Sequence, residues 1–340
     1  MEPYLFDFDI EKHPSRPKYL QLADGLLADI ETGKLKLNQP LPSVNKLSKE
    51  LSISRETVFK ALNFLSERGV IKSANRQGYF VINTDVKRKA RIFFLLDKFT
   101  TFKEKMYLSF QKAIGDQGDV EIFFHHHNLS VFRSLIIDNL PHYTHFVVLT
   151  FLREDVKDIL NLIPANKRLI IDSYEPNLNG DYPMIYQDFS GDIYNAMEKA
   201  GDRLKKYKRL ILVAPGTLFH SALVIQGFQK FARDSGFPTK VVQNVNGDDF
   251  HVGDVYLTLS GYDQELVEVI KLSRSKAYTI GKDIGIISYN DTPVKEVLEG
   301  GITVINTSWE YMGSKAAEML LNQETKTMAN PTQLIFRNSL

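Results

Sequence analysis

The stretch LPSVNKLSKELSISRETVFKALNFLSERG, residues 41–69, decides the fold of the first part of the chain. Ser43 and Ser54 each precede helix-forming residues, as helix N-caps do, and Gly69 provides a C-terminal stop. The spacing therefore predicts two short helices, over residues 44–51 and 55–68. The apolar residues of the second helix share one face, which we expect to be buried: Val58, Ala61, Leu62 and Leu65.

The flanking segments complete a small domain. Residues 19–32 carry apolar side chains along one helical face and end before Gly33. Residues 70–71 and 79–82 have the composition of β-strands, and a polar stretch at 73–78 separates them. Three short helices followed by a β-hairpin predict a winged helix-turn-helix within residues 1–83.

Charge is unevenly distributed along the chain. The 340 residues carry a net charge of +1, but residues 1–90 hold 15 Lys and Arg against 11 Asp and Glu, and the other 250 hold 27 against 30. A basic segment joined to a larger, slightly acidic one favours a polyanion-binding module attached to a second domain. A solvated basic face is the simpler alternative.

The predicted helix-turn-helix indicates double-stranded DNA as a partner, because a recognition helix presents its N-terminal residues to base edges in the major groove. Arg55 suits a bidentate bond to guanine, and the hydroxyls of Ser54 and Thr57 suit phosphates. Residues 76–77 at the wing tip could reach the backbone or the minor groove. The candidate DNA-binding residues are Ser43, Ser54, Arg55, Glu56, Thr57, Lys60, Arg76, Gln77 and Gly78. Each one alone is also an ordinary solvated side chain.

Several motifs of this first domain carry a family resemblance. They are Leu41-Pro42-Ser43, Ser54-Arg55-Glu56-Thr57-Val58, Gly69-Val70-Ile71 and Gly78-Tyr79-Phe80-Val81. In these motifs, residues 15–83 resemble the GntR family of bacterial transcriptional regulators. Asn45 and Phe59 depart from the family pattern, which often has Arg at both positions, so the operator sequence is not implied. Phe59 could touch a thymine methyl group or pack beneath the wing.

Residues 84–90 contain the run Lys87-Arg88-Lys89 and are expected to form a solvated linker, with added phosphate contacts as the alternative. Beyond them, residues 91–340 alternate short apolar strands with helical segments. This alternation predicts βα units with parallel sheets buried on both faces. The length allows one barrel or two doubly wound lobes. We expect an α/β architecture in which the winged helix-turn-helix precedes a two-lobed domain with doubly wound parallel sheets.

Composition excludes several classes of protein and site. The chain has no Cys, so disulfides, thiol nucleophiles and thiolate metal sites are excluded. No signal peptide or long apolar stretch is visible, so we expect a cytoplasmic protein that does not contact a membrane. No G-x-G-x-x-G after a strand, phosphate loop, H-E-x-x-H or G-x-S-x-G motif appears. The run at residues 125–127 is three His, which we interpret as a polar strand end and not as a metal site.

The C-terminal part carries a second resemblance, clearest at residues 281–291, 301–306 and 312–320 and weaker at 169–172, 187–191, 209–213, 226–228 and 261–264. In these segments the chain resembles the LacI/GalR-type effector domain, which has the type I periplasmic-binding-protein fold. The resemblance implies two lobes and a sugar ligand. A GntR-type reader joined to this domain is similar to the arrangement in arabinose repressors of Gram-positive bacteria.

Ligands of open α/β sheets bind at the carboxyl ends of the strands. Polar and aromatic residues near predicted strand ends, together with the positions that the resemblance implies, give the effector-binding candidates Asp97, Lys98, Phe99, Asp172, Phe250, Tyr262 and Asn290. No Arg lies between Arg209 and Arg233, where relatives place a ligand-clamping Arg. A neutral monosaccharide therefore fits better than an anionic ligand.

The sequence thus predicts a sugar-responsive transcriptional regulator, a repressor of a carbohydrate-utilisation operon that an arabinose- or fucose-like sugar releases. It is expected to act as a homodimer on an operator and to need no cofactor, metal ion or catalytic residue. Two alternatives stay open. The second domain could serve only for dimerisation, or the chain could be a sugar-processing enzyme with a DNA-binding appendage.

Overall fold

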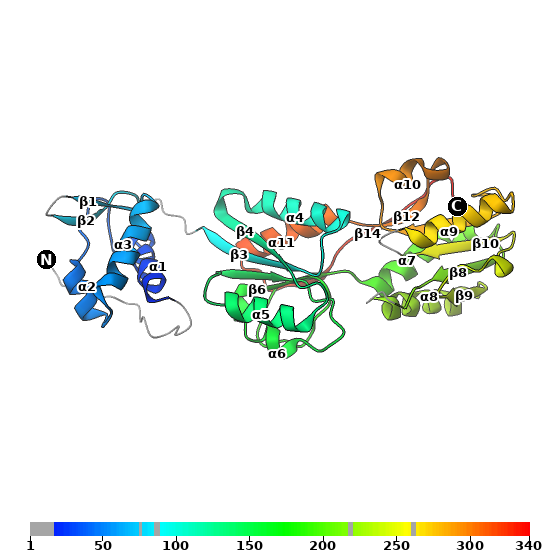
Figure 1. The fold of residues 1–340 in the computed structure, drawn as a ribbon. Helices are drawn as coiled ribbons and strands as arrows, with labels where there is room; N and C mark the ends of the chain where they lie inside the picture. Colours follow the sequence, from blue (N-terminus) through cyan, green and yellow to red (C-terminus); the bar gives the residue numbers. More distant parts are fainter. Residues whose placement is uncertain (1–16, 75–76, 85–88, 217–219, 260–262) are drawn as a thin grey trace. The chain divides into compact units, whose positions relative to one another are not determined.

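The computed structural model describes residues 17–74, 77–84, 89–216, 220–259 and 263–340 (Figure 1). They fall into two compact units. One reaches to residue 94 and includes residues 115–123 and 130–146, and the other comprises residues 95–114, 124–129 and 147–340. The predicted linker at residues 84–90, between the two domains, stays a prediction, because residues 85–88 lie outside the described ranges.

The predicted winged helix-turn-helix is present. Its elements are α1 (Lys18–Glu31), α2 (Val44–Glu50), α3 (Arg55–Glu67), β1 (Ile71–Ala74) and β2 (Gly78–Val81). The two strands pair antiparallel, with Ile71 opposite Val81. The predicted stripe of α3 is buried in a core shared with α1 and the hairpin, so helical periodicity alone identified the inner face of the recognition helix.

Two open six-stranded sheets follow, with strand orders β13-β7-β6-β5-β3-β4 and β14-β12-β11-β10-β8-β9. Within the second sheet the pairs are parallel, except that the edge strand β14 runs antiparallel to β12. The described strands form no closed barrel, and the predicted doubly wound α/β class is confirmed. The strands are β3 (Ala90–Leu96), β4 (Gly118–Phe124), β5 (His145–Val148), β6 (Arg168–Asp172), β7 (Met184–Tyr186), β8 (Arg209–Val213), β9 (Thr239–Val242), β10 (Asp254–Thr258), β11 (Gly285–Tyr289), β12 (Thr303–Thr307), β13 (Thr327–Ala329) and β14 (Thr332–Ile335).

Helices connect most of these strands, as βα units require. In the second unit α4 packs against α11, and α7 packs against α8. Among the described residues, no helix combines the length and apolar character that crossing a bilayer needs. The helices are α4 (Thr101–Ile114), α5 (Leu129–Asn139), α6 (Lys157–Leu160), α7 (Phe189–Leu204), α8 (Ser221–Ser235), α9 (Gln264–Ser275), α10 (Pro293–Val297) and α11 (Trp309–Leu321), with 3-10 turns at Gly115–Gln117, Ala165–Lys167, Gly247–Asp249 and Leu298–Gly300.

Three connections link the two sheets. The chain leaves β7 of the first sheet and enters α7, which packs against β12 and β14 of the second. It returns from β12 into α11, which packs against β6 and β7, and it passes once more from β13 to β14. Residues 187–188, 308 and 330–331 occupy these three connections.

Glycine permits the close approach of α4 and α11. A Cβ atom added at Gly313 would lie 2.0 Å from the backbone oxygen of Met106. Gly201 in α7 has open space instead, with nothing within 4 Å of the added Cβ. Only the first glycine is therefore required by packing.

Replacing Gly313 with Ala should destabilise the second unit by about 1–3 kcal/mol, because the added methyl group forces the two helices apart. Gly201→Ala is the matched control, and it should stabilise by about 0.5–1 kcal/mol through helix propensity. Chemical denaturation measures both changes. Equal effects of the two substitutions would contradict the packing described for α4 and α11.

Candidate functional site

The start of α3 is held by two of the hydroxyl groups predicted to contact DNA. The Ser54 side chain accepts a hydrogen bond from the Thr57 backbone N–H at 3.1 Å, and the two hydroxyl oxygens are 2.8 Å apart. Arg55, the first residue of α3, is exposed. Ser54 and Thr57 thus have a structural task in fixing the N-terminal turn from which Arg55 projects.

The neighbouring candidates are exposed on the same pair of helices. Ser43 caps α2 by accepting from the Lys46 backbone N–H at 3.2 Å. Glu56 and Lys60 form an i, i+4 ion pair at 3.0 Å with both side chains largely exposed. An exposed pair of this kind adds little stability, so these two side chains remain available to a partner.

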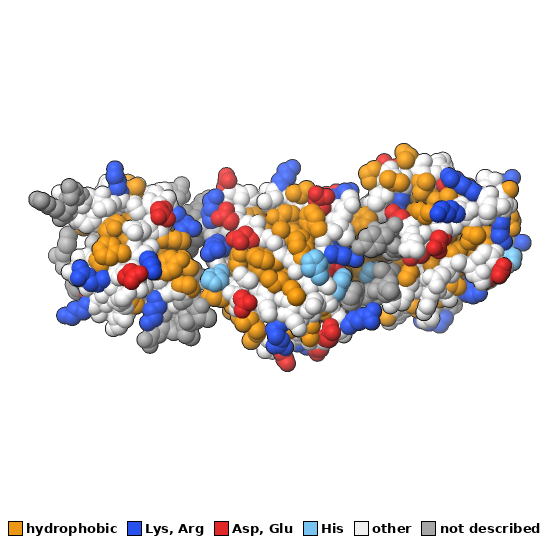
Figure 2. Space-filling view, in the orientation of Figure 1, with side chains coloured by type: hydrophobic (Ala, Val, Ile, Leu, Met, Phe, Trp, Pro, Cys, Tyr) orange, Lys and Arg blue, Asp and Glu red, His pale blue; other side chains and the backbone are white. Residues whose placement is uncertain are grey.

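The wing is described only in part. Gln77 and Gly78 are exposed at the turn of the hairpin, and Arg76 lies outside the described residues. Phe59 on α3 is 44% exposed, which favours contact with a partner over packing beneath the wing. In the view of Figure 2, the charged side chains of this winged helix-turn-helix are mostly Lys and Arg.

The second group of candidates begins at the carboxyl end of β3. Asp97 is 2% exposed and forms a short ion pair with Lys103 near the start of α4. His127, just beyond β4, places its Nε2 atom 3.4 Å from the second carboxylate oxygen of Asp97. The cation of Lys103 therefore compensates a carboxylate that would otherwise be costly to bury.

Asp172 lies at the carboxyl end of β6, with no exposed surface and a left-handed backbone at φ 68°. Gln187 donates a hydrogen bond from Nε2 to Oδ1 of Asp172. Oδ2 is buried and has no hydrogen-bond partner within the described part of the chain. Burial raises the pKa of Asp172 to about 6, against the opposing effects of the Lys103 charge and the Gln187 hydrogen bond.

An aromatic group adjoins these charges. Phe189, the first residue of α7, stacks on His220 with ring centroids 4.3 Å apart, and the ring of Phe151 lies 6.3 Å from that of His220. The ammonium group of Lys103 is 5.3 Å from the Phe151 ring centroid. Burial, reinforced by the Lys103 charge, lowers the pKa of His220 to about 4, so this ring is neutral at pH 7.

Asn290 occupies the corresponding position after β11 in the second sheet, again with positive φ. Its side-chain oxygen accepts a hydrogen bond from the Trp309 indole N–H at 3.2 Å, and its backbone carbonyl accepts one from Lys295 at 2.8 Å. Lys295 is buried and also bonds Asp263 at 2.8 Å. The strand end is thus held rigidly by groups from α10 and α11.

The remaining candidates are placed less decisively. Lys98 is partly buried beside Asp97, and Phe99 is 48% exposed and packs against Tyr107 and Phe124. Tyr262 lies outside the described residues. The structure therefore brings together Asp97 and Asp172, because the charge of Lys103 acts on both. An effector-binding role stays a prediction for these two and for Lys98, Phe99, Tyr262 and Asn290.

Phe250 requires a correction. It is fully buried and stacks on Tyr256 and Tyr278, with centroids 4.9 and 6.2 Å away. The preceding Asp249 pairs with Arg209, the first residue of β8, which places this segment at the amino ends of the strands. Phe250 is a core residue there, and a ligand at the carboxyl ends would lie at the opposite edge of the sheet.

Sequence reasoning missed Lys103, Gln187 and His220. No local motif marks Lys103, because its role arises from the pairing with a strand end six residues earlier. Gln187 lies in the segment 187–191, which carries the weaker resemblance, and a polar amide next to a predicted strand end could have marked it there. No sequence signal marks His220.

The three consecutive His residues directly follow the end of β4. His125 is fully buried with Nε2 3.2 Å from the Leu149 carbonyl oxygen, and His127 has Nδ1 3.0 Å from the Phe151 carbonyl oxygen. Burial lowers the pKa of His125 to about 4. Within the described ranges, no group of three metal-ligating side chains converges.

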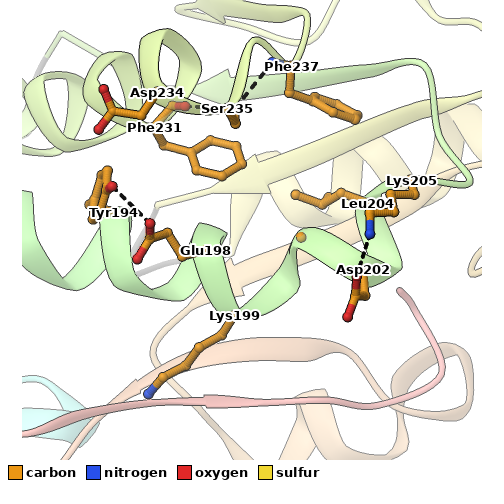
Figure 3. Close-up of a pocket in the computed structure, with 11 residues that line it drawn as sticks. Tyr194, Glu198, Lys199, Asp202, Leu204, Lys205, Phe231, Asp234, Ser235 and Phe237 are labelled. Carbon is orange, nitrogen blue, oxygen red and sulfur yellow. Dashed lines mark hydrogen bonds and ion pairs between the residues drawn. The ribbon is translucent and has the colours of Figure 1, made fainter.

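A separate surface pocket of about 440 Å³ lies between α7 and α8 (Figure 3). Its polar side chains are largely paired with one another. Tyr194 donates to Glu198 at 2.8 Å, and Lys205 bonds Asp202 at 2.7 Å. None of the residues that line this pocket is among the strand-end candidates.

Asp172→Asn should stabilise the protein at neutral pH. A carboxyl whose pKa rises from 3.8 to about 6 on folding costs on the order of 3 kcal/mol at pH values above 6. The charged form is the disfavoured one, so the cost disappears as pH falls from about 6 to below 4. The stability gain of the Asn variant should therefore be largest at pH 8 and about half as large at pH 5.

Urea denaturation at the two pH values measures this difference, and Asp181→Asn at an exposed position is the control. A gain that does not change between pH 8 and pH 5 would show that ionisation of Asp172 is not its cause.

Two family models match this chain. Residues 18–81 match "Bacterial regulatory proteins, gntR family", and residues 204–340 match a "periplasmic binding protein-like domain". The first match covers the three helices and the hairpin. The second covers Asn290 and all six strands of the second sheet.

Curated relatives match only part of this chain. The mannosyl-D-glycerate transport/metabolism system repressor MngR of Escherichia coli is 32% identical over 108 residues, which is 32% of this chain and 41% of that protein. The arabinose metabolism transcriptional repressor of Geobacillus stearothermophilus is 33% identical over 70 residues, 21% of this chain and 19% of that one. The matched region thus spans less than half the length of these relatives.

Solved structures extend the similarity to the whole fold. The Lac repressor dimer bound to operator and the anti-inducer ONPF superposes with a TM-score of 0.63 at 15% identity, covering 87% of this chain and 94% of that one. At this identity the similarity establishes the fold alone. Residues 18–81 are thus similar to the gntR family of regulatory proteins and residues 204–340 to periplasmic-binding-protein-like domains, and the fold is that of the Lac repressor.

Proposed function

We propose that this protein is a transcriptional repressor whose affinity for its DNA operator is set by a small sugar. The observation that supports this most directly is the pairing of two parts in one chain, an exposed recognition helix and a doubly wound domain with buried polar groups at its strand ends. Two relatives, a repressor of a mannosyl-D-glycerate transport and metabolism system and an arabinose metabolism repressor, agree with it.

The DNA-binding part would act as one half of a dimer. One recognition helix contacts only a few base pairs, so two heads on a pseudo-palindromic operator are needed for useful specificity. Arg55 at the start of α3 would bond a guanine edge, and the basic face around it would neutralise phosphates. Ser43, Gln77 and Gly78 are exposed, which suits contacts with the DNA backbone.

The strand-end cluster favours a neutral polyhydroxylated effector. The buried Oδ2 atom of Asp172 is an acceptor suited to a sugar hydroxyl. The charge of Lys103 is already compensated by Asp97, so an anionic ligand gains little there. Of the two stacked rings beside these charges, Phe189 is buried and His220 is partly exposed, so His220 is the ring that a sugar face would contact. Arabinose and fucose are the first sugars to test.

Arg55→Ala should weaken specific DNA binding. Loss of one bidentate base contact costs about 1–3 kcal/mol, or roughly 5–150-fold in affinity. The DNA is a duplex selected from a random pool by the wild-type protein, and fluorescence anisotropy measures the affinity. Lys112→Ala, which removes an exposed cation from α4, should bind as wild type does. Equal affinities for all three proteins would exclude Arg55 from base recognition.

A sugar effector should stabilise the folded protein. A ligand at 100 times its dissociation constant adds about 2.7 kcal/mol, which a thermal-shift panel of arabinose, fucose, xylose and glucose detects. Trp309, the single Trp of the chain, bonds Asn290, so its fluorescence should change with the same sugar. Asp172→Asn should abolish both signals. A panel with no response would favour the alternative in which the second domain only dimerises.

A further inference from the structure

A buried carboxamide lies where the chain first passes from one sheet to the other. Gln187 follows β7 of the first sheet and precedes α7, which packs against β12 and β14 of the second. The residue is only 5% exposed. A buried amide must have its donor and its acceptor satisfied, because an unmade hydrogen bond costs about 1–3 kcal/mol.

The two ends of this carboxamide bond to different sheets. Its Nε2 atom donates to Oδ1 of Asp172, at the carboxyl end of β6 in the first sheet. Its Oε1 atom accepts from the Thr307 hydroxyl at 2.9 Å and faces the Tyr289 hydroxyl at 3.5 Å, both at carboxyl ends of strands in the second sheet. One side chain therefore joins the proposed effector-binding carboxylate to the second lobe.

The two residues of the second sheet that face the Gln187 oxygen lie where a change in the relative position of the sheets would disturb their hydrogen bonds. Thr307 is the last residue of β12, directly before the connection into α11. Tyr289 ends β11, and its hydroxyl also donates to Asp192 in the first turn of α7 at 3.3 Å. Thr307 and Tyr289 are 1% and 3% exposed, so water does not substitute readily for these bonds.

We infer that Gln187 is a positioning residue that couples occupation of Asp172 to the arrangement of the two sheets. A sugar hydroxyl that bonds Oδ2 of Asp172 redistributes the charge of this carboxylate and weakens or realigns the bond at Oδ1. Gln187 then transmits the change to Thr307 and Tyr289, since hydrogen bonds that share one amide polarise each other. This inference rests on the proposed function, because it concerns the response to the same effector.

The test separates effector binding from effector response. Thr307→Val keeps the β-branched shape and the Gln187–Asp172 bond but removes the hydroxyl that bonds Oε1. Gln187→Met keeps the side-chain length and removes both ends of the link. Thr303→Val is the matched control, because Thr303 is also buried on β12 and hydrogen-bonded, but to Arg337 at the opposite end of the strand.

Each variant is titrated with the sugar that stabilises wild type, and its DNA affinity is measured with and without that sugar. We expect Thr307→Val to bind the sugar within about threefold of wild type, and we expect both variants to bind DNA normally without it. The sugar-induced loss of DNA affinity, typically 5–150-fold in allosteric proteins, should fall at least fivefold in both variants and stay unchanged in Thr303→Val.

The outcomes distinguish the two claims. If wild type binds no sugar, or binds one without a change in DNA affinity, the proposed function fails. If wild type responds and Thr307→Val responds equally, the link through Gln187 is overturned while the proposed function stands. A loss of sugar affinity in Thr307→Val that matches its loss of response would also overturn the inference, since the residue would then serve binding alone.

Discussion

Burial of a carboxylate at the carboxyl ends of the first sheet is the constraint on which the second domain depends. Asp172 has no exposed surface, and one of its oxygens has no partner in the described part of the chain. Such a group persists only where its surroundings compensate for desolvation. The charge of Lys103 and the amide of Gln187 do so in part. A hydroxyl-bearing ligand would complete the hydrogen bonding of Asp172. The unpaired oxygen that lowers the stability of the folded protein would then also favour binding of such a ligand.

The N-terminal domain is stabilised differently, because its contacts are made within its own residues. Caps at Ser43 and Ser54 start two helices, and a single apolar stripe joins them to α1 and the hairpin. Nothing in this core depends on the strand-end charges of the second unit. Under the proposed function, a sugar signal would have to reach DNA through the placement of whole domains. Hydrogen bonds at the connections between the sheets are the groups that such a movement would rearrange first.

These contrasts explain what the sequence could and could not predict. The recognition helix and its buried face follow from spacing alone. Asp172 and Asn290 were predicted as effector-binding residues because each stands at the end of an apolar strand, and that role stays a prediction. Lys103 and Gln187 were missed because their roles come from partners brought close by the fold. The short strands β7, β13 and β14 carry too few residues for a clear pattern. Phe250 was misplaced because aromatic composition does not distinguish a core residue from a ligand contact.

Thermodynamic linkage tests the central claim most directly. If the sugar lowers DNA affinity by some factor, DNA must lower sugar affinity by that same factor. Calorimetric titration of the active sugar into the free protein and into its operator complex measures the second factor, and anisotropy measures the first. The account predicts two equal factors, both well above one. Identical sugar dissociation constants with and without operator would contradict it.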